Sequence, residues 1–212
     1  MTVPILDVPA NPSADSLEIE QAARALAEGA IVAIPTETVY GLCVDPALAP
    51  AVALLRSLKG RDGDKPLAVL VPGVEAAAGL GVVPSWAEPM LADVWPGPLT
   101  VVLSLRDPAL RVLGSEETIG VRVPDDAVAL AVLERVGRPV AATSANTGGQ
   151  RPLESAEEIA REFGEQVAIV LRAPTHGSGR PSSVVDLTSY PPAVLREGEV
   201  TAGRVLELCR LP

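Results

Sequence analysis

The sequence predicts one α/β domain, formed by residues 1–212, with a twisted, mixed sheet and flanking helices. Apolar runs of strand length alternate with segments of helical periodicity, and strand-like segments predominate near the end of the chain. The chain is 48% hydrophobic but has only two Trp, two Tyr and one Phe, so its core must consist of Val, Leu, Ile and Ala. No internal repeat and no linker composition divides it.

The first predicted elements are a helix and a buried strand. Residues 15–28 carry apolar side chains at helical spacing, and Asp15 and Glu18 match a capping box. Residues 30–34 form a short apolar run that ends at a proline, as expected for a buried strand. The polar residues of 35–42 lie between two apolar segments, so we expect the end of this strand to expose hydroxyl groups to a cleft.

A second helix, over 46–58, is expected to lead into a basic loop. Only two of the 17 basic residues are lysines, and both lie in this loop, at Lys59 and Lys65. The Asp-Gly-Asp sequence at 62–64 favours a turn, which would present Lys59, Arg61 and Lys65 together as an anion-binding site. A charged turn that only contacts solvent is the alternative that this stretch leaves open.

The middle of the chain is expected to alternate between strands and short helices. Runs of branched aliphatic residues indicate the strands, and a Pro-Gly-Pro sequence indicates a rigid turn. In chain order we expect a strand over 67–71, helices over 74–79 and 85–93, a turn at 95–98, strands over 99–105 and 119–123, and a helix over 125–136.

The last third is expected to contain mostly strands. Ser155 and Glu158 match a second capping box, for a helix that ends near Gly164. The segment 173–182 is rich in Pro, Gly and Ser and is expected to be a loop. Strands are expected over 140–143, 167–171, 183–187, 193–196 and 205–208.

Composition and charge argue against several classes of protein. The net charge of −10 opposes non-specific binding to nucleic acid, so an anionic substrate would need a local basic patch. There is no apolar run of about 18 residues and no basic segment followed by an apolar one at the start, so we expect neither a membrane span nor a signal peptide. Cys43 and Cys209 make neither a metal-ligand spacing nor a disulfide framework, which favours a cytoplasmic protein.

Familiar catalytic motifs are missing. No Gly-Lys pair occurs, so there is no Walker A loop, and neither GxGxxG nor GxSxG is present. The single histidine, His176, lies in a glycine-rich segment, where we expect a surface histidine. Histidine-rich metal sites and a Ser-His-Asp triad are therefore disfavoured.

Polar side chains that could bind anions follow the predicted strands. Arg122 lies between two valines, and its guanidinium suits a carboxylate; an internal salt bridge to Asp125 or Asp126 is the alternative. Ser144 and Asn146 follow a strand and precede glycines, which suits a phosphate or ribose, although ordinary turn chemistry explains them as well.

Further hydroxyl groups lie at two other strand ends. Ser182 and Ser183 precede a late strand, and Thr36, Thr38 and Tyr40 either contact a small polar substrate or are ordinary strand-end residues. No candidate is an obvious nucleophile or general base. Phosphoryl and nucleotidyl transfer depend mostly on positioning and charge neutralisation, and Mg²⁺ can arrive with the nucleotide.

Seven segments between residues 35 and 198 resemble, in order, the L-threonylcarbamoyladenylate synthase family, the YrdC and Sua5 proteins. Each is a weak match alone, whereas seven in register are specific. They are Pro35-Thr36-Glu37-Thr38-Val39-Tyr40-Gly41, Lys59-x-Arg61-x-x-x-Lys65-Pro66-Leu67, Trp95-Pro96-Gly97-Pro98-Leu99-Thr100, Gly120-Val121-Arg122-Val123-Pro124, Thr143-Ser144-Ala145-Asn146, Ser182-Ser183-Val184-Val185-Asp186 and Leu195-Arg196-x-Gly198.

The resemblance implies a YrdC-like fold with a large, concave, basic cleft and a nucleotidyltransferase activity. The implied reaction forms threonylcarbamoyl-AMP and pyrophosphate from L-threonine, bicarbonate or CO₂, and ATP carried with Mg²⁺. The product would pass to a tRNA threonylcarbamoyl transferase complex, which makes the t6A modification beside certain anticodons. The net charge of −10 argues against direct tRNA binding.

The resemblance also implies roles for individual residues. Lys59 and Arg61 would be catalytic, because they would offset charge on the α-phosphate. The nucleotide would be bound by Lys59, Arg61, Lys65, Thr118, Ser144, Asn146 and Arg196. Threonine would be bound by Thr38, Arg122 and Ser182, with Arg122 on its carboxylate. Whether Glu37 acts as a base or only shapes the strand end is left open.

The chain departs from the family pattern at three positions. Gly148 stands where serine is common, Ser183 where threonine is usual, and Asp62 where proline is common. The chain resembles the short form, without the extra C-terminal domain of Sua5. A YciO-like paralogue, an RNA-binding module and a carbamoyl-transfer domain like that of hydrogenase-maturation proteins are the alternatives; the intact Lys-x-Arg and Ser-x-Asn pairs favour the synthase.

Overall fold

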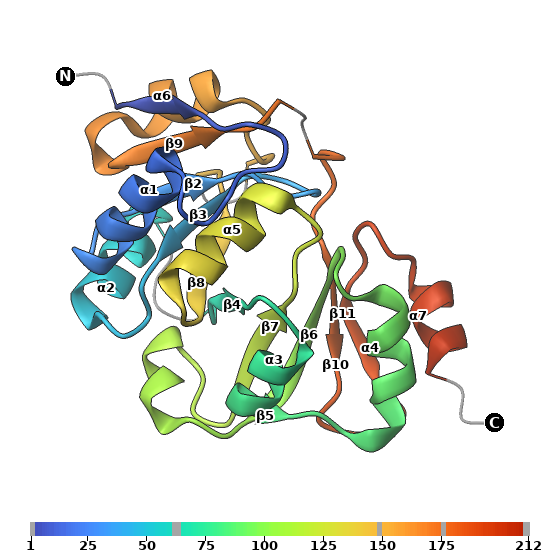
Figure 1. Ribbon diagram of the computed structural model, residues 1–212. Helices are drawn as coiled ribbons and strands as arrows, with labels where there is room; N and C mark the ends of the chain where they lie inside the picture. Colours follow the sequence, from blue (N-terminus) through green and yellow to red (C-terminus); the bar gives the residue numbers. More distant parts are fainter. Residues whose placement is uncertain (1–2, 61–64, 148–149, 175–176, 210–212) are drawn as a thin grey trace.

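A computed structural model describes residues 3–60, 65–147, 150–174 and 177–209. Within them, eleven strands form one twisted sheet in the order β1-β9-β2-β3-β8-β4-β7-β6-β10-β11, and β5 pairs with β6 outside this path (Figure 1). The strands are β1 Ile5–Asp7, β2 Val32–Ile34, β3 Gly41–Val44, β4 Ala68–Leu70, β5 Gly81–Val82, β6 Leu99–Leu105, β7 Thr118–Arg122, β8 Val140–Ser144, β9 Ile169–Arg172, β10 Ser183–Asp186 and β11 Ala193–Arg196.

The sheet is mixed, as the sequence predicts. β9 runs parallel to both β1 and β2, β4 runs parallel to β7, and β10 runs parallel to β6. The central pairs β2–β3, β3–β8, β4–β8 and β6–β7 are antiparallel. This arrangement confirms an α/β fold on a twisted mixed sheet with flanking helices.

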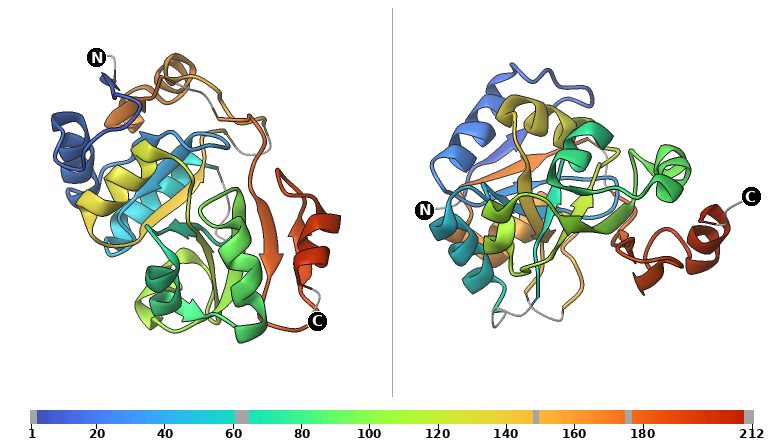
Figure 2. Two further views of the ribbon diagram at one scale, coloured as in Figure 1. Left: turned by 45° about the vertical axis from the view of Figure 1, so that its right-hand side comes forward. Right: turned by 90° about the horizontal axis from the view of Figure 1, so that it is seen from below.

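Helices flank the sheet and extend beyond its end (Figure 2). The α-helices are α1 Leu17–Ala27, α2 Ala49–Leu58, α3 Val74–Leu80, α4 Glu88–Val94, α5 Ala127–Val136, α6 Ala156–Phe163 and α7 Ala202–Leu208. Short 3₁₀ turns cover Ser85–Ala87, Pro108–Leu113 and Gly164–Gln166. The views show α7 at one end of the molecule, away from α1 at the other.

Two aliphatic cores lie on opposite faces of the sheet. Ile19 of α1 and Val132 of α5 belong to one core, and Leu55 of α2 and Ile159 of α6 belong to the other. The residues of β2 alternate between them, because successive side chains of a strand point to opposite faces. Burial on both sides explains why the sequence of β2, at 32–34, is apolar throughout.

Most predicted elements are present within a few residues of their expected bounds, and β6 spans the predicted 99–105. Residues 205–208, predicted as a strand, are instead the end of α7. The side chain of Thr201 accepts a hydrogen bond from the backbone N–H of Arg204 and begins this helix. Its single buried residue, Val205, gives no pattern that distinguishes a short strand from a short helix.

The two predicted capping boxes fare differently. The first is wrong, because α1 starts after Ser16, whose side chain makes no capping hydrogen bond. In the second, Ser155 Oγ accepts from the N–H of Glu158 at 3.1 Å. The Glu158 carboxylate, however, accepts from the N–H of Glu154 rather than from that of Ser155.

The second predicted helix, expected over 46–58, begins later than expected, at Ala49.

Candidate functional site

A cavity of about 430 Å³ lies over one face of the sheet, where residues of β4, β6, β7, β8, β10 and β11 line it. Its lining includes five of the predicted site residues: Thr118, Arg122, Ser144, Ser182 and Arg196. They come from segments between 118 and 196, so the sheet order brings them together although they are far apart in the sequence. We call this space the central cavity.

The sequence led us to expect Lys59 on an exposed loop, but the structure places it elsewhere. It caps the C-terminus of α2 and is only 1% exposed. Its Nζ donates to Ser144 O at 2.7 Å, to Asn146 Oδ1 at 2.5 Å and to Asn146 O. A buried ammonium is stable only with such partners, so Lys59 fixes the turn that follows β8.

The Ser144–Asn146 turn is itself held by further hydrogen bonds. Ser144 Oγ donates to Asn146 Oδ1 at 2.6 Å, and Asn146 Nδ2 donates to Gln150 O at 2.7 Å. The structure therefore joins Lys59, Ser144 and Asn146 in one cluster, with Ser144 at the cavity wall. The side chains of Ser144 and Asn146 thus make the hydrogen bonds of an ordinary turn, which is one of the two interpretations of this segment.

The rest of the predicted basic loop is only partly described. Lys65 is exposed and precedes Pro66, which lines the central cavity. Arg61 and the predicted turn at 62–64 lie outside the described residues, as do Gly148 and His176.

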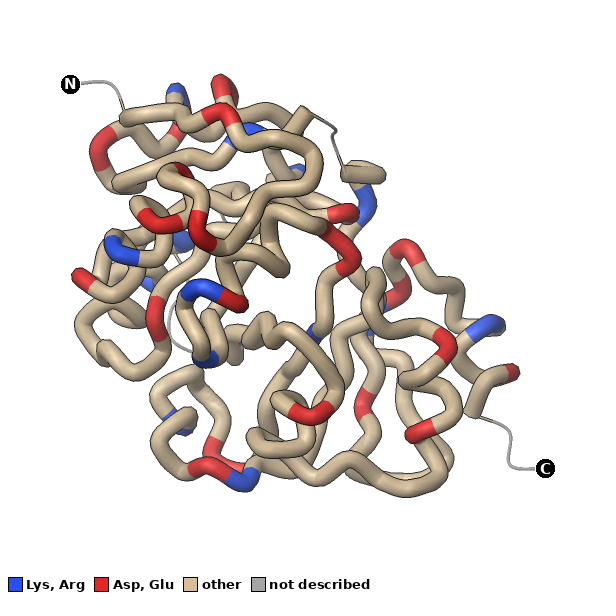
Figure 3. The backbone as a smooth tube through the Cα atoms, in the orientation of Figure 1, with Lys and Arg blue, Asp and Glu red and all other residues tan. Residues whose placement is uncertain are grey.

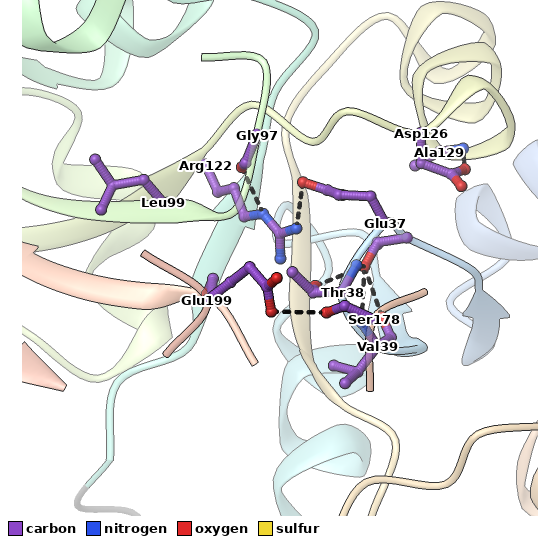
Figure 4. A network of polar contacts seen from close by, with 12 residues as sticks. Glu37, Thr38, Val39, Gly97, Leu99, Arg122, Asp126, Ala129, Ser178 and Glu199 are labelled. Carbon is purple, nitrogen blue, oxygen red and sulfur yellow. Dashed lines mark hydrogen bonds and ion pairs between the residues drawn. The ribbon is translucent and has the colours of Figure 1, made fainter. Parts of the chain in front are cut away.

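Arg122 is buried at the cavity wall, with 6% of its surface exposed. Its Nε donates to Gly97 O at 3.2 Å, and its Nη2 lies 2.7 Å from Glu37 Oε1 (Figure 4). The internal salt bridge considered from the sequence thus exists, but its partner is Glu37 and neither Asp125 nor Asp126.

Asp126 has a different role, at the start of α5. Its carboxylate accepts from the N–H of Ala129 at 2.9 Å and caps the helix. Burial raises the pKa of Asp126, the backbone hydrogen bonds oppose this, and the nearby charge of Glu37 raises the pKa further.

Hydroxyl groups surround the arginine-containing part of the cavity. Thr36 Oγ1 and Thr38 Oγ1 are 2.9 Å apart, and both residues are buried. Ser182 Oγ lies 2.8 Å from Thr100 Oγ1, and Arg196 Nη2 donates to Ser182 O at 2.7 Å. Thr36, Thr100 and Ser182 line the central cavity.

Two of the predicted residues point elsewhere. Thr38 lines a second hollow of about 390 Å³, beside Leu153 and Gly177, instead of the central cavity. Ser183 is fully buried, and its Oγ donates to Val200 O and accepts from the N–H of Gly198 at 2.9 Å. Ser183 is therefore a structural residue that joins β10 to the loop after β11.

The sequence did not reveal the partners of Glu37 and Thr100, although Glu37 had been considered as a base or as a residue that shapes the strand end. Both belong to segments of the family resemblance, which was the available signal. Neither contact was predictable locally, because Glu37 meets Arg122 from 85 positions away and Thr100 meets Ser182 from 82 positions away.

A glycine-containing segment holds the Thr36–Val39 turn in place. The N–H groups of Ser178 and Gly179 donate to Glu37 O at 2.8 Å and Thr38 O at 2.9 Å. A Cβ at Gly177 would lie 2.6 Å from Thr36 O, so the segments approach too closely for a side chain. This packing fixes the backbone from which Glu37 reaches Arg122.

Acidic residues are distributed widely over the chain, in keeping with its net charge (Figure 3). The charged residues on the described lining of the central cavity are Arg122, Arg196 and Asp186. The lining is therefore less acidic than the protein as a whole.

No described helix is long and apolar enough to cross a membrane. No group of three or more His, Cys, Asp or Glu side chains within the described ranges is arranged to hold a metal ion.

Comparison with known proteins identifies the family to which the chain belongs. The family model Sua5_yciO_yrdC, described as "Telomere recombination", matches residues 24–198. The threonylcarbamoyl-AMP synthase of Bacillus subtilis is 35% identical over 94% of this chain and 59% of its own length. That of Halorhodospira halophila is 37% identical over 82% of this chain and 93% of its own length.

Solved structures give the same result. P. abyssi Sua5, crystallised with L-threonine, superposes with a TM-score of 0.89 at 34% identity, over 96% of this chain and 60% of its own. E. coli YciO superposes with a TM-score of 0.87 at 24% identity, over 96% of this chain and 99% of its own, which is a likeness of fold. The chain spans 59% and 54% of the Bacillus subtilis and Pyrococcus abyssi synthases.

Proposed function

Because this chain belongs to the Sua5, YciO and YrdC family, we propose that it is an L-threonylcarbamoyladenylate synthase. This nucleotidyltransferase would form threonylcarbamoyl-AMP and pyrophosphate from L-threonine, bicarbonate or CO₂, and ATP. The relatives named threonylcarbamoyl-AMP synthase and the Sua5 structure with L-threonine support this proposal.

One observation from the geometry carries the proposal. Arg122, which suits a carboxylate, and Ser144, which Lys59 and Asn146 support, line the same central cavity. An amino acid and a nucleotide that must react need such neighbouring sites, because holding two reactants together removes much of the entropic barrier.

The reaction would proceed in two bond-forming steps. The threonine amine attacks CO₂, an N–C bond forms, a proton is released, and a carbamate results. A carbamate oxygen then attacks the α-phosphorus of ATP, and the bond from that phosphorus to the leaving pyrophosphate breaks. Arg122 would hold the threonine carboxylate and Ser182 would contact the amino acid, so that the carbamate faces the nucleotide.

The nucleotide would contact Ser144, Thr118 and Arg196. Lys59 has its ammonium within the turn after β8, so we propose that it supports Ser144 and Asn146 and adds positive charge beneath the phosphates. Arg61 and Lys65 would complete this site. Thr38, which is buried beside Thr36, would shape the threonine site from behind.

Mg²⁺ would arrive on the triphosphate and reduce its charge during attack. Asp186 is the one carboxylate on the described lining of the central cavity, which fits a metal held mainly by phosphate oxygens and water. The activated product would pass to a tRNA threonylcarbamoyl transferase complex for t6A synthesis.

The test is release of pyrophosphate by the pure protein. The protein is incubated with ATP, Mg²⁺, bicarbonate and L-threonine, and parallel reactions contain serine, no amino acid or no bicarbonate. Release that requires threonine and bicarbonate supports the synthase. Threonine binding without release would point to a YciO-like paralogue, and absence of both would reject the proposed function.

A further inference from the structure

The central cavity presents a problem of charge selection. Arg122 and Arg196 line the same space, and the proposed function requires one to bind an amino-acid carboxylate and the other to lie near a triphosphate. A triphosphate carries several negative charges and a carboxylate carries one. An arginine with no carboxylate beside it would therefore attract the triphosphate more strongly. Something must keep phosphoryl groups away from Arg122.

Glu37 lies behind Arg122 and is placed to do this. Glu37 Oε1 approaches Arg122 Nη2 to 2.7 Å, and both atoms are shielded from solvent. The contact lacks the alignment of a good hydrogen bond, so it is chiefly electrostatic. Glu37 is absent from the cavity lining, whereas Arg122 is present in it, so a ligand would contact the arginine and sense the glutamate through it.

The geometry of the arginine reinforces this arrangement. Nε is engaged by Gly97 O and Nη2 by Glu37, so two of the three guanidinium nitrogens are directed into the protein (Figure 4). Glu37 is held by its own backbone, because its carbonyl accepts the N–H of Ser178 at 2.8 Å. The ion pair therefore fixes the plane of the Arg122 guanidinium and reduces the positive charge that a ligand meets there.

On the basis of the proposed function, we infer that Glu37 is a specificity-determining and positioning residue that reserves Arg122 for a singly charged carboxylate and excludes dianionic phosphoryl groups. Glu37 offsets much of the positive charge of Arg122, so each additional negative charge on a ligand gains much less attraction there than it would from an unpaired arginine.

The size of the effect follows from Coulomb's law. A ligand on the free side of the guanidinium would lie about 6 Å from the Glu37 carboxylate, from ordinary hydrogen-bond lengths. At an effective dielectric constant of about 20, each unit of ligand charge then changes affinity by roughly 100-fold. Salt reduces this, so we expect Glu37 to discriminate a dianion from a monoanion by about tenfold or more.

The experiment measures threonine binding by calorimetry, with and without sulfate, at constant ionic strength set by chloride. Sulfate is a dianion that is neither substrate nor product. Wild-type protein should bind threonine with an affinity that sulfate changes by less than about twofold. In Glu37→Gln, which keeps the side-chain shape, sulfate should compete and weaken apparent threonine binding by about tenfold or more.

Three further variants make the result interpretable. Glu37→Ala also removes the charge and should behave like Glu37→Gln, which covers the case that one of them folds poorly. Glu37→Asp keeps the charge and should resist sulfate, as should Glu134→Gln, which makes the same charge change at an exposed position on α5. A purely structural role for Glu37 would lower threonine binding without creating competition by sulfate.

The outcomes separate the inference from the proposed function. Threonine binding by wild-type protein with no sulfate competition in either charge-removing variant would overturn the inference and leave the synthase proposal intact. Absence of threonine binding by wild-type protein would overturn the proposed function and the inference with it. Competition in the charge-removing variants alone supports both.

Discussion

Replacing Lys59 by methionine should destabilise the protein by about 2–3 kcal/mol. Methionine approximates the length of lysine but has no donor. In the described structure Lys59 is the donor to Asn146 O, and that buried oxygen would lose its hydrogen bond, at a typical cost of about 1–3 kcal/mol. Asn146 Oδ1 keeps the Ser144 Oγ donor and would lose less.

The assay is thermal unfolding, with Lys65→Met as the control at an exposed lysine. We expect Lys59→Met to lower the midpoint of thermal unfolding by about 5–10 °C and Lys65→Met to stay within about 2 °C of wild type. ATP binding, measured below the transition, should be lost in Lys59→Met because the Ser144–Asn146 turn is no longer fixed. A Lys59→Met protein as stable as wild type would refute the buried-ammonium argument.

Three further predictions concern single contacts. Arg122→Ala should raise the threonine KM by about 30-fold or more while the ATP KM stays within about threefold, and equal effects in steady-state kinetics would make Arg122 structural. Ser155→Ala should cost about 1 kcal/mol in urea unfolding, whereas Ser16→Ala should cost little, because Ser155 alone of the two accepts a capping hydrogen bond; equal costs would contradict this assignment. Gly177→Ala should impair threonine binding measured by calorimetry, because its Cβ would collide with the carbonyls of Thr36 and Thr38; unchanged binding would show that the turn tolerates displacement.

The sequence predicts the sheet well because its strands are buried on both faces. Val32 and Ile34 pack into one core and Ala33 into the other, so the apolar run is visible without knowledge of the partners. The error at 205–208 arose where only Val205 is buried, since one apolar anchor cannot define a period. Local pattern therefore identifies elements in proportion to how deeply they are buried.

The candidate site was predictable in its members but not in its contacts. Five proposed residues line the central cavity because each begins, ends or directly precedes a strand of the same sheet. The burial of Lys59 was missed, because only the pairing of β3 with β8 brings Ser144 and Asn146 near α2. Likewise, nothing near Arg122 in the sequence identifies Glu37, whose position depends on the folded chain.

The order of strands has a consequence for synthesis on the ribosome. β9 lies between β1 and β2, and β10 pairs with β6, so strands made late fill positions beside strands made much earlier. A nascent chain that ends before residue 183 would contain Arg122 but would lack both β10 and β11. Ligand binding should therefore arise late in translation, and the edge of β6 that pairs with β10 stays open until β10 has been made.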